Sequence, residues 1–101
     1  MSTAAAPVTQ TLVNLQAAYE GESNATIKYT AFAIKAEVEG FYRAAALFRA
    51  AARAEQVHAA HHARIILKLG GTPTAKIHEV EVKSTRENLE AARAGKSTSA
   101  M

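Results

Sequence analysis

The sequence contains no cysteine, few residues that break helices and no long apolar run. The absence of cysteine excludes disulfides, thiolate metal sites, cysteine nucleophiles and iron–sulfur centres, and it fits a cytoplasmic protein. No apolar segment approaches the ~18 residues that a transmembrane helix needs, so we expect no membrane association. The first residues, MSTAAAPV, lack the charged region and the apolar stretch of a secretory signal.

The chain also lacks a large excess of positive or negative charge, and its formal net charge is only +3. The basic residues are scattered, and no aromatic surface for stacking bases accompanies them, so we do not expect nucleic-acid binding. What the sequence does contain is alanine, with 49% hydrophobic and 21% charged residues. This balance in 101 residues predicts one small all-α domain.

The first long helix is predicted over residues 11–39, where apolar residues and a few polar ones recur in steps of three and four. Thr9 or Thr11 can cap its start, and Gly40 can end it in a left-handed conformation. Residues 1–10 are expected to form a flexible N-terminus. The stripe expected to face a partner consists of Leu12, Leu15, Tyr19, Glu22, Thr26, Tyr29, Ala33 and Ala36.

The second long helix is predicted over residues 41–69, and Gly70, Gly71 and Pro73 stop it. Each helix would be about 43 Å long. The tight connection at Gly40 predicts an antiparallel hairpin of the kind found in helical bundles. The second stripe consists of Phe41, Ala44, Phe48, Ala51, Glu55, His58, His62, Ile65 and Leu69.

After the hairpin, residues 70–83 form a linker that we expect to run as an extended crossover along the bundle. Ser84 and Glu87 fit a capping box, which starts a short third helix over residues 84–95. Residues 96–101 are expected to form a frayed tail. The glutamates off the two stripes are expected to be solvated, and they are Glu20, Glu37, Glu39 and Glu79.

The chain also contains an internal sequence repeat. NLQAAYEGES at residues 14–23 aligns with NLEAARAGKS at residues 88–97, where Asn, Leu, two Ala, Gly and Ser coincide. This similarity indicates a duplication, and hence an ancestor with two helical hairpins. In the alignment Lys96 takes the place of Glu22.

Three polar residues interrupt the apolar stripes: Glu22 on the first helix, and Glu55 and His58 on the second. Glu55 and His58 are three residues apart and therefore project from one face. At about 1.5 Å per residue, all three lie about 22–27 Å from the turn at Gly40, so they should meet at one height. Unpaired buried carboxylates are costly, which makes a bound cation the best explanation for this cluster.

One hairpin would supply only three ligands and would leave its apolar faces in water. Two hairpins around a twofold axis would form a four-helix bundle with four glutamates and two histidines at one level. That set matches the di-iron or di-manganese carboxylate pattern, in which four carboxylates neutralise two divalent ions. Carboxylate and imidazole donors without thiolate favour iron, manganese or zinc.

At these residues the sequence resembles the rubrerythrin family of the ferritin-like superfamily. NLQAAYEGESNATIKYTAFAIKAEVEG resembles the first helix of that family, with Glu22 in its GES motif and Tyr29 following. FRAAARAEQVHAAHH resembles the second helix, which carries the Glu-x-x-His pair. The resemblance covers residues 12–69 well and residues 84–97 weakly.

The resemblance implies a non-haem dinuclear iron site that reduces hydrogen peroxide or O2, with two iron ions per dimeric bundle. It implies that Glu22 and His58 are terminal ligands, that Glu55 bridges the metals, and that Tyr29 lies near the site in a hydrogen-bonding role. We expect His62 to be a core histidine or to support a ligand. His61 and His78 are expected at the surface.

The sequence departs from the family in its second half. Where the family carries GExxE on a third helix, this chain reads GKSTS, with Lys96 and Ser99 in place of the carboxylates. A rubredoxin-like domain is also absent, so electrons would come from an external donor such as a rubredoxin or a flavoprotein. Two alternatives stay open at this point: a ferroxidase or iron-storage protein, and a metal-free helical interaction module.

Overall fold

The computed structural model describes the backbone of residues 2–99 and the side chains of residues 9–95. The chain forms three helices, α1 (Ser2–Val38), α2 (Tyr42–Lys68) and α3 (Thr85–Ser99). No strand occurs within residues 2–99, which confirms the all-α class. In this part of the chain no helix combines the length and the apolar character needed to span a membrane.

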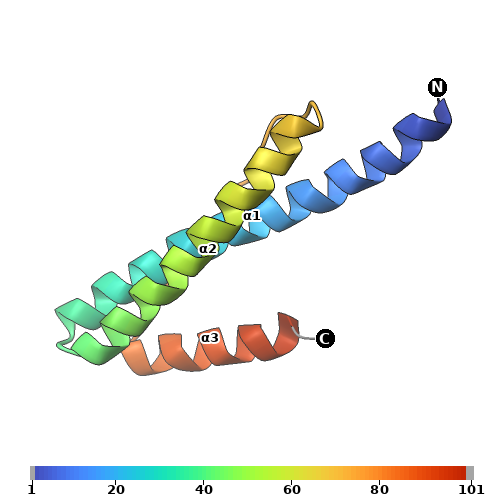
Figure 1. Cartoon of the computed structure of the whole chain (residues 1–101). Helices are drawn as coiled ribbons and strands as arrows, with labels where there is room; N and C mark the ends of the chain where they lie inside the picture. Colours follow the sequence, from blue (N-terminus) through green and yellow to red (C-terminus); the bar gives the residue numbers. More distant parts are fainter. Residues whose placement is uncertain (1, 100–101) are drawn as a thin grey trace.

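The two long helices form the expected antiparallel hairpin, which dominates the elongated shape of the chain (Figure 1). Gly40 has a φ of 84°, and the N–H of Phe41 donates to the carbonyl of Ala36 at 2.8 Å. Gly70 repeats this arrangement after α2, with a φ of 87°. Both glycines therefore end their helices in the left-handed conformation, as predicted for Gly40, because only glycine adopts it without a steric penalty.

The helix ends differ from the predictions at both termini. α1 begins at Ser2, so residues 2–10 are helical rather than a flexible segment, and Thr9 and Thr11 lie inside the helix. Alanine, which occupies residues 4–6, has the strongest helix propensity and favours the extension, although Pro7 follows. α3 continues to Ser99, because the backbone of Gly95 does not adopt a positive φ. The side chains of Lys96 and Ser99 lie outside the described residues.

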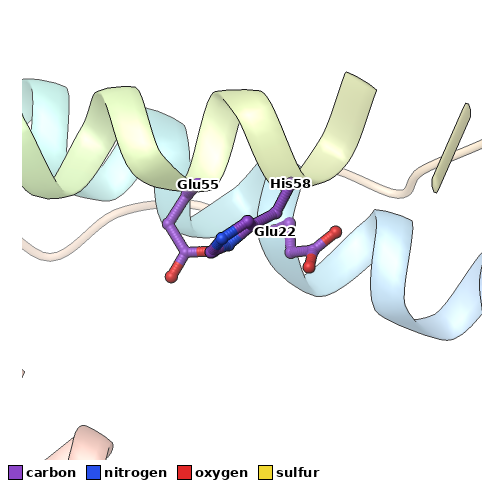
Figure 2. Close-up of side chains that lie close together, drawn as sticks. All are labelled: Glu22, Glu55 and His58. Atoms are coloured by element: carbon purple, nitrogen blue, oxygen red, sulfur yellow. The ribbon is translucent and has the colours of Figure 1, made fainter. Parts of the chain in front are cut away.

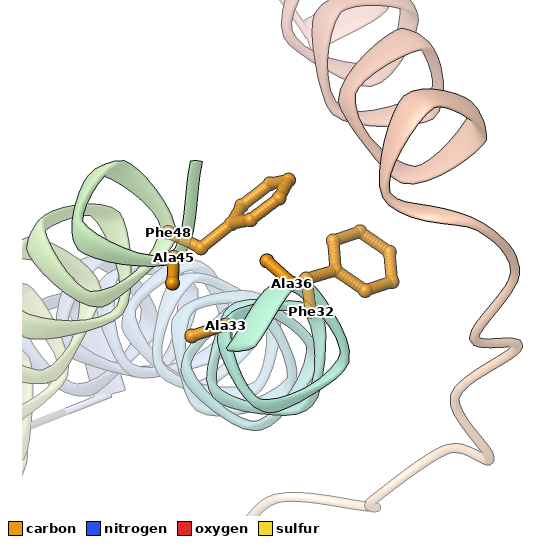
Figure 3. Packing of buried hydrophobic residues seen from close by; sticks show 5 residues of the cluster. All are labelled: Phe32, Ala33, Ala36, Ala45 and Phe48. Carbon is orange, nitrogen blue, oxygen red and sulfur yellow. The ribbon is translucent and has the colours of Figure 1, made fainter. Parts of the chain in front are cut away.

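The core of the hairpin is aromatic and alanine-rich, and Figure 3 shows its packing near the turn. The Phe48 ring of α2 stacks on Tyr29 at 6.2 Å and meets the edge of Phe32 at 5.3 Å, both from α1. Small residues pack around these rings and let the helices approach closely. The buried residues of α2 are Ala45, Phe48, Ala52, Ala59 and Ile66.

This set shows that the predicted stripe of α2 was wrong by one residue at several positions. Ala45 and Ala52 are buried against α1, whereas the predicted Ala44 and Ala51 are half-buried beside them. Both alanine series have the same helical spacing and the same hydrophobicity, so periodicity alone could not separate them. The shift means that α2 turns the predicted stripe partly toward the open side of the hairpin.

The linker between α2 and α3 has neither helix nor strand and follows α1, as expected for an extended crossover. Polar side chains on successive turns of α1 bind its backbone. Gln16 accepts from the N–H of Thr74 at 3.0 Å, Glu20 accepts from the N–H of Lys76 at 2.9 Å, and Asn24 accepts from the N–H of His78 at 2.7 Å. Glu20 was therefore wrongly predicted to be merely solvated.

Four residues of α1 rise about 6 Å, which is close to the rise of two extended residues. This match in rise explains why side chains four apart on the helix can bind linker residues two apart. The crossover is thereby fastened along α1 and delivers the chain back to the turn of the hairpin, where α3 begins (Figure 1).

The start of α3 is held by two carboxylates. Ser84 and Glu87 form the predicted capping box, with the Glu87 N–H donating to Ser84 Oγ at 3.2 Å. Glu39 at the end of α1 accepts from the N–H of Thr85 at 2.7 Å and from its hydroxyl at 2.5 Å. Glu39 is thus a second helix cap supplied from another helix, and not the solvated charge that its position off the stripe predicted.

Candidate metal centre

The structure brings together the three residues that the sequence predicted as metal ligands. Each of Glu22, Glu55 and His58 offers one ligand atom, and these atoms all lie within 4.8 Å of one another. Figure 2 shows Glu22 on α1 and the other two on α2, clustered on one side of the hairpin. Their similar distance from the Gly40 turn places them at one height because the hairpin is antiparallel.

The burial of these side chains differs from the prediction. The exposed fractions of the Glu22 and Glu55 side chains are 19% and 30%, whereas that of His58 is 59%. The prediction that all three are buried is therefore wrong for His58 in the single chain. The one-residue shift of the buried stripe is the reason, because Ala59 rather than His58 faces α1.

A second histidine reaches the cluster from the next turn of α2. Nδ1 of His62 lies 2.7 Å from Oε1 of Glu22, and 3.0 Å from the backbone carbonyl of His58. His62 therefore contacts a candidate ligand directly, as the alternative of a supporting histidine predicted. His61 and His78 are exposed, as expected.

The cluster borders a hollow of about 630 Å³ that opens to solvent. Its lining includes Glu22, Lys28, Tyr29 and Glu55 from the hairpin and Gly95 from α3. The alanines that line it are Ala18, Ala25, Ala51 and Ala54. The hollow thus combines apolar alanines with two carboxylates and one ammonium group.

Tyr29 lies close enough to the cluster for the charge of Glu55 to affect its phenol. Burial, and then the negative charge of Glu55, raise the pKa of the Tyr29 phenol above its ordinary value of 10.0. The ring packs against Phe32 and Phe48 in the aromatic core. Tyr29 therefore stays a neutral hydrogen-bond donor at physiological pH.

The donor set fits a divalent cation. Two carboxylates and one imidazole are ligands that iron, manganese and zinc accept. The carboxylates would balance the charge of one divalent ion, and the open hollow leaves room for further ligands. A single chain therefore presents two carboxylates and one imidazole, which is half the number of ligands that dinuclear carboxylate proteins use.

Fold and cluster together define a helical protein of the ferritin-like kind, with a carboxylate–histidine group on one face of a helical hairpin. The family model described as Rubrerythrin matches residues 13–100, so the chain belongs to the rubrerythrin family. Among characterised proteins it is similar to nigerythrin of Nitratidesulfovibrio vulgaris, with 51% identity over 51 residues. That match covers 50% of this chain but only 25% of nigerythrin. No solved structure matches the chain.

Proposed function

We propose that two copies of this chain form a four-helix bundle that binds two iron ions and reduces hydrogen peroxide with electrons from an external donor. The observation that carries this proposal is the convergence of Glu22, Glu55 and His58 within 4.8 Å on the open face of the hairpin. Membership of the rubrerythrin family supports the choice of iron.

The same face supports the assembly into a dimer. Four residues of α2 follow one another in steps of four, three and four and therefore share one stripe: Leu47, Ala51, Ala54 and His58. Ala51 and Ala54 line the hollow, and Leu47 is 62% exposed. An apolar stripe beside a half-complete ligand set is what a symmetric partner would cover. The second copy would also supply the two carboxylates and the imidazole that one chain lacks.

Each residue of the site has a role that follows from its chemistry. Glu22 and His58 would each hold one ion, and Glu55 would join the two, because its carboxylate has two oxygens. When bound, iron supplies the electrons that reduce the O–O bond. Tyr29 would donate a hydrogen bond to an oxygen atom in the hollow, since its raised pKa keeps the phenol protonated. The apolar alanines would exclude bulk water from that space.

Peroxide is the substrate we favour over O2, because Tyr29 and Lys28 line the hollow and offer hydrogen bonds that the oxygens of H2O2 accept. These 101 residues contain no cysteine for an electron-transfer iron, so the electrons would reach the site from a rubredoxin-type centre or a flavoprotein outside them.

The test is to load the metal-free chain anaerobically with Fe(II), count iron per dimer by native mass spectrometry, and mix it with H2O2 or O2. We expect two irons per dimer and faster oxidation by H2O2 than by O2. Glu55→Gln should abolish the dinuclear species, whereas Glu79→Gln, a change at an exposed linker carboxylate, should have no effect. Faster reaction with O2 would indicate a ferroxidase instead, and a chain that takes up no metal would be an interaction module.

A further inference from the structure

We infer that His62 is a positioning residue that orients Glu22 for the cation through a hydrogen bond from Nδ1. The inference rests on the proposed function because it concerns the same cluster. It adds a fourth residue to the site, one that acts through a ligand.

The contact between His62 and Glu22 is the best-formed polar interaction in the cluster. The distance from Nδ1 to Oε1 is 2.7 Å, and the exposed fractions of the two side chains are only 26% and 19%. By contrast, Nδ1 of His58 lies 3.6 Å from Oε1 of Glu55, which is too long for a hydrogen bond. One carboxylate of the cluster is therefore held by a histidine, and the other is not.

The surroundings of His62 also determine which ring nitrogen carries the hydrogen. Nδ1 faces the Glu22 carboxylate at 2.7 Å and the His58 carbonyl at 3.0 Å, and both groups only accept. Nδ1 must therefore be the donor. The bond to the carbonyl one turn back fixes the ring to its own helix, and the bond to Glu22 links α2 to α1.

The consequence concerns how Glu22 meets a cation. A carboxylate has two oxygens and about four lone-pair sites, so one hydrogen bond leaves the others for a metal. A free glutamate loses rotamer entropy when it is ordered. Because His62 orders Glu22 during folding, part of this entropy is lost before a cation binds. Groups that orient ligands in this way typically account for about 10- to 100-fold in metal affinity.

The experiment measures Co(II) affinity by visible absorption titration of the full chain carrying single substitutions at position 62. His62→Asn keeps a nitrogen donor on Cγ, where Nδ1 is attached, whereas His62→Gln moves the donor one bond outward. We expect His62→Ala and His62→Gln to weaken Co(II) binding about 10- to 100-fold. His62→Asn should stay within about threefold of the unsubstituted chain. His61→Ala is the matched control, because His61 is the exposed neighbour, and should change nothing.

Two results would overturn the inference: His62→Ala binding as tightly as the unsubstituted chain, or His62→Gln binding more tightly than His62→Asn. The second result would mean that Nε2 itself ligates the metal. Should His62→Ala fail to fold by circular dichroism, the comparison of Asn with Gln decides.

A metal-free readout separates this inference from the proposed function. The ¹⁵N NMR spectrum of the apo chain should show His62 with its hydrogen on Nδ1, and Glu22→Gln should change that signal. An Nε2–H tautomer would refute the positioning role even if Co(II) binds. Absence of Co(II) binding by the unsubstituted chain, with the Nδ1–H tautomer present, would refute the proposed function and the effect on affinity, while leaving the orientation of Glu22 established.

Discussion

Replacing Glu55 by glutamine should change stability in opposite directions with and without metal. In the metal-free chain, the carboxylates of Glu22 and Glu55 lie within 4.8 Å of each other and repel. Glutamine has nearly the same shape but no charge, so the substitution removes the repulsion with little change in packing. It also removes a candidate ligand, so a cation should no longer bind between the two side chains.

The size of the first effect follows from the separation of the two groups. Two unit charges at 4.8 Å, the upper limit of the separation, repel by about 1 kcal/mol at the dielectric constant of water and by about 3.5 kcal/mol at an effective constant of about 20. The side chains are 19% and 30% exposed, and His62 already pairs with Glu22. We therefore expect the lower value, about 1 kcal/mol, which raises Tm by about 4–8 °C in a domain of this size.

The second effect follows from binding linkage. A cation at 100 times its Kd stabilises the native state by about 2.7 kcal/mol, which corresponds to a rise in Tm of about 10–20 °C. Glu55→Gln should lose most of that rise. The stabilisation by metal thus exceeds the relief of repulsion, and the variant should melt above the unsubstituted chain without metal and below it with metal.

Differential scanning calorimetry at one protein concentration, with and without Mn(II), measures both effects. Glu79→Gln serves as the control for the loss of one negative charge, because Glu79 is exposed in the linker. The reasoning would be refuted if Glu55→Gln lowered Tm without metal and kept the full metal-induced rise. Glu55 would then have a structural partner and no role in binding.

Three further predictions concern the aromatic core, the Glu39 cap of α3 and the phenol of Tyr29. Phe48→Ala should destabilise the chain by about 3–5 kcal/mol in urea unfolding, because the ring is 3% exposed. Leu47→Ala, at the 62% exposed neighbour, should cost at most about 0.5 kcal/mol in dilute solution but should weaken the proposed dimer. The hydrogen bonds from the Thr85 side chain and backbone lower the pKa of Glu39 below 4.5. The stabilisation that this cap gives to α3 is therefore complete above pH 4.5. It is lost as the pH falls through the lowered pKa, and NMR should then show α3 detaching first. Burial and the charge of Glu55 raise the pKa of Tyr29 above 10.0, so its contribution to stability is complete below pH 10.0 and is lost as the pH rises through the raised value, as ultraviolet titration should show.

Each of these three has a contrary outcome. Equal losses for Phe48→Ala and Leu47→Ala in dilute solution would mean that the aromatic cluster is not the core of the hairpin. Global acid unfolding without earlier loss of α3 signals would show that the cap from Glu39 is not what secures α3. A Tyr29 phenol that ionised below 10.0 would contradict its burial beside a carboxylate.

Local signals allowed much of the fold to be predicted. Gly40 ends α1 because glycine tolerates positive φ, and Ser84 with Glu87 begins α3 because both groups of the capping box are close in sequence. The limits of α2 were predicted to within one residue at each end. Non-local contacts were not predictable in the same way, since nothing in the sequence shows that the linker passes Glu20 or that Thr85 meets Glu39.

The candidate ligands were predictable because their spacing encodes their height. Glu22, Glu55 and His58 lie at similar distances along the chain from Gly40, and an antiparallel hairpin converts similar distance into proximity. Their burial was not predictable with the same certainty. His58 and Ala59 each continue a helical stripe of α2, and packing against α1 selected the alanine for the buried position.

By itself the sequence determined that this is an alanine-rich helical hairpin with two carboxylates and an imidazole at one height, because helical periodicity and glycine stops act through neighbours along the chain. Only the tertiary structure decided which face of α2 turns inward, that Glu20 and Glu39 bind backbone groups, and that His62 contacts Glu22. Those outcomes depend on the rotation of one helix about its axis against another, and small residues on several sides of α2 leave that rotation to the packing of the aromatic core.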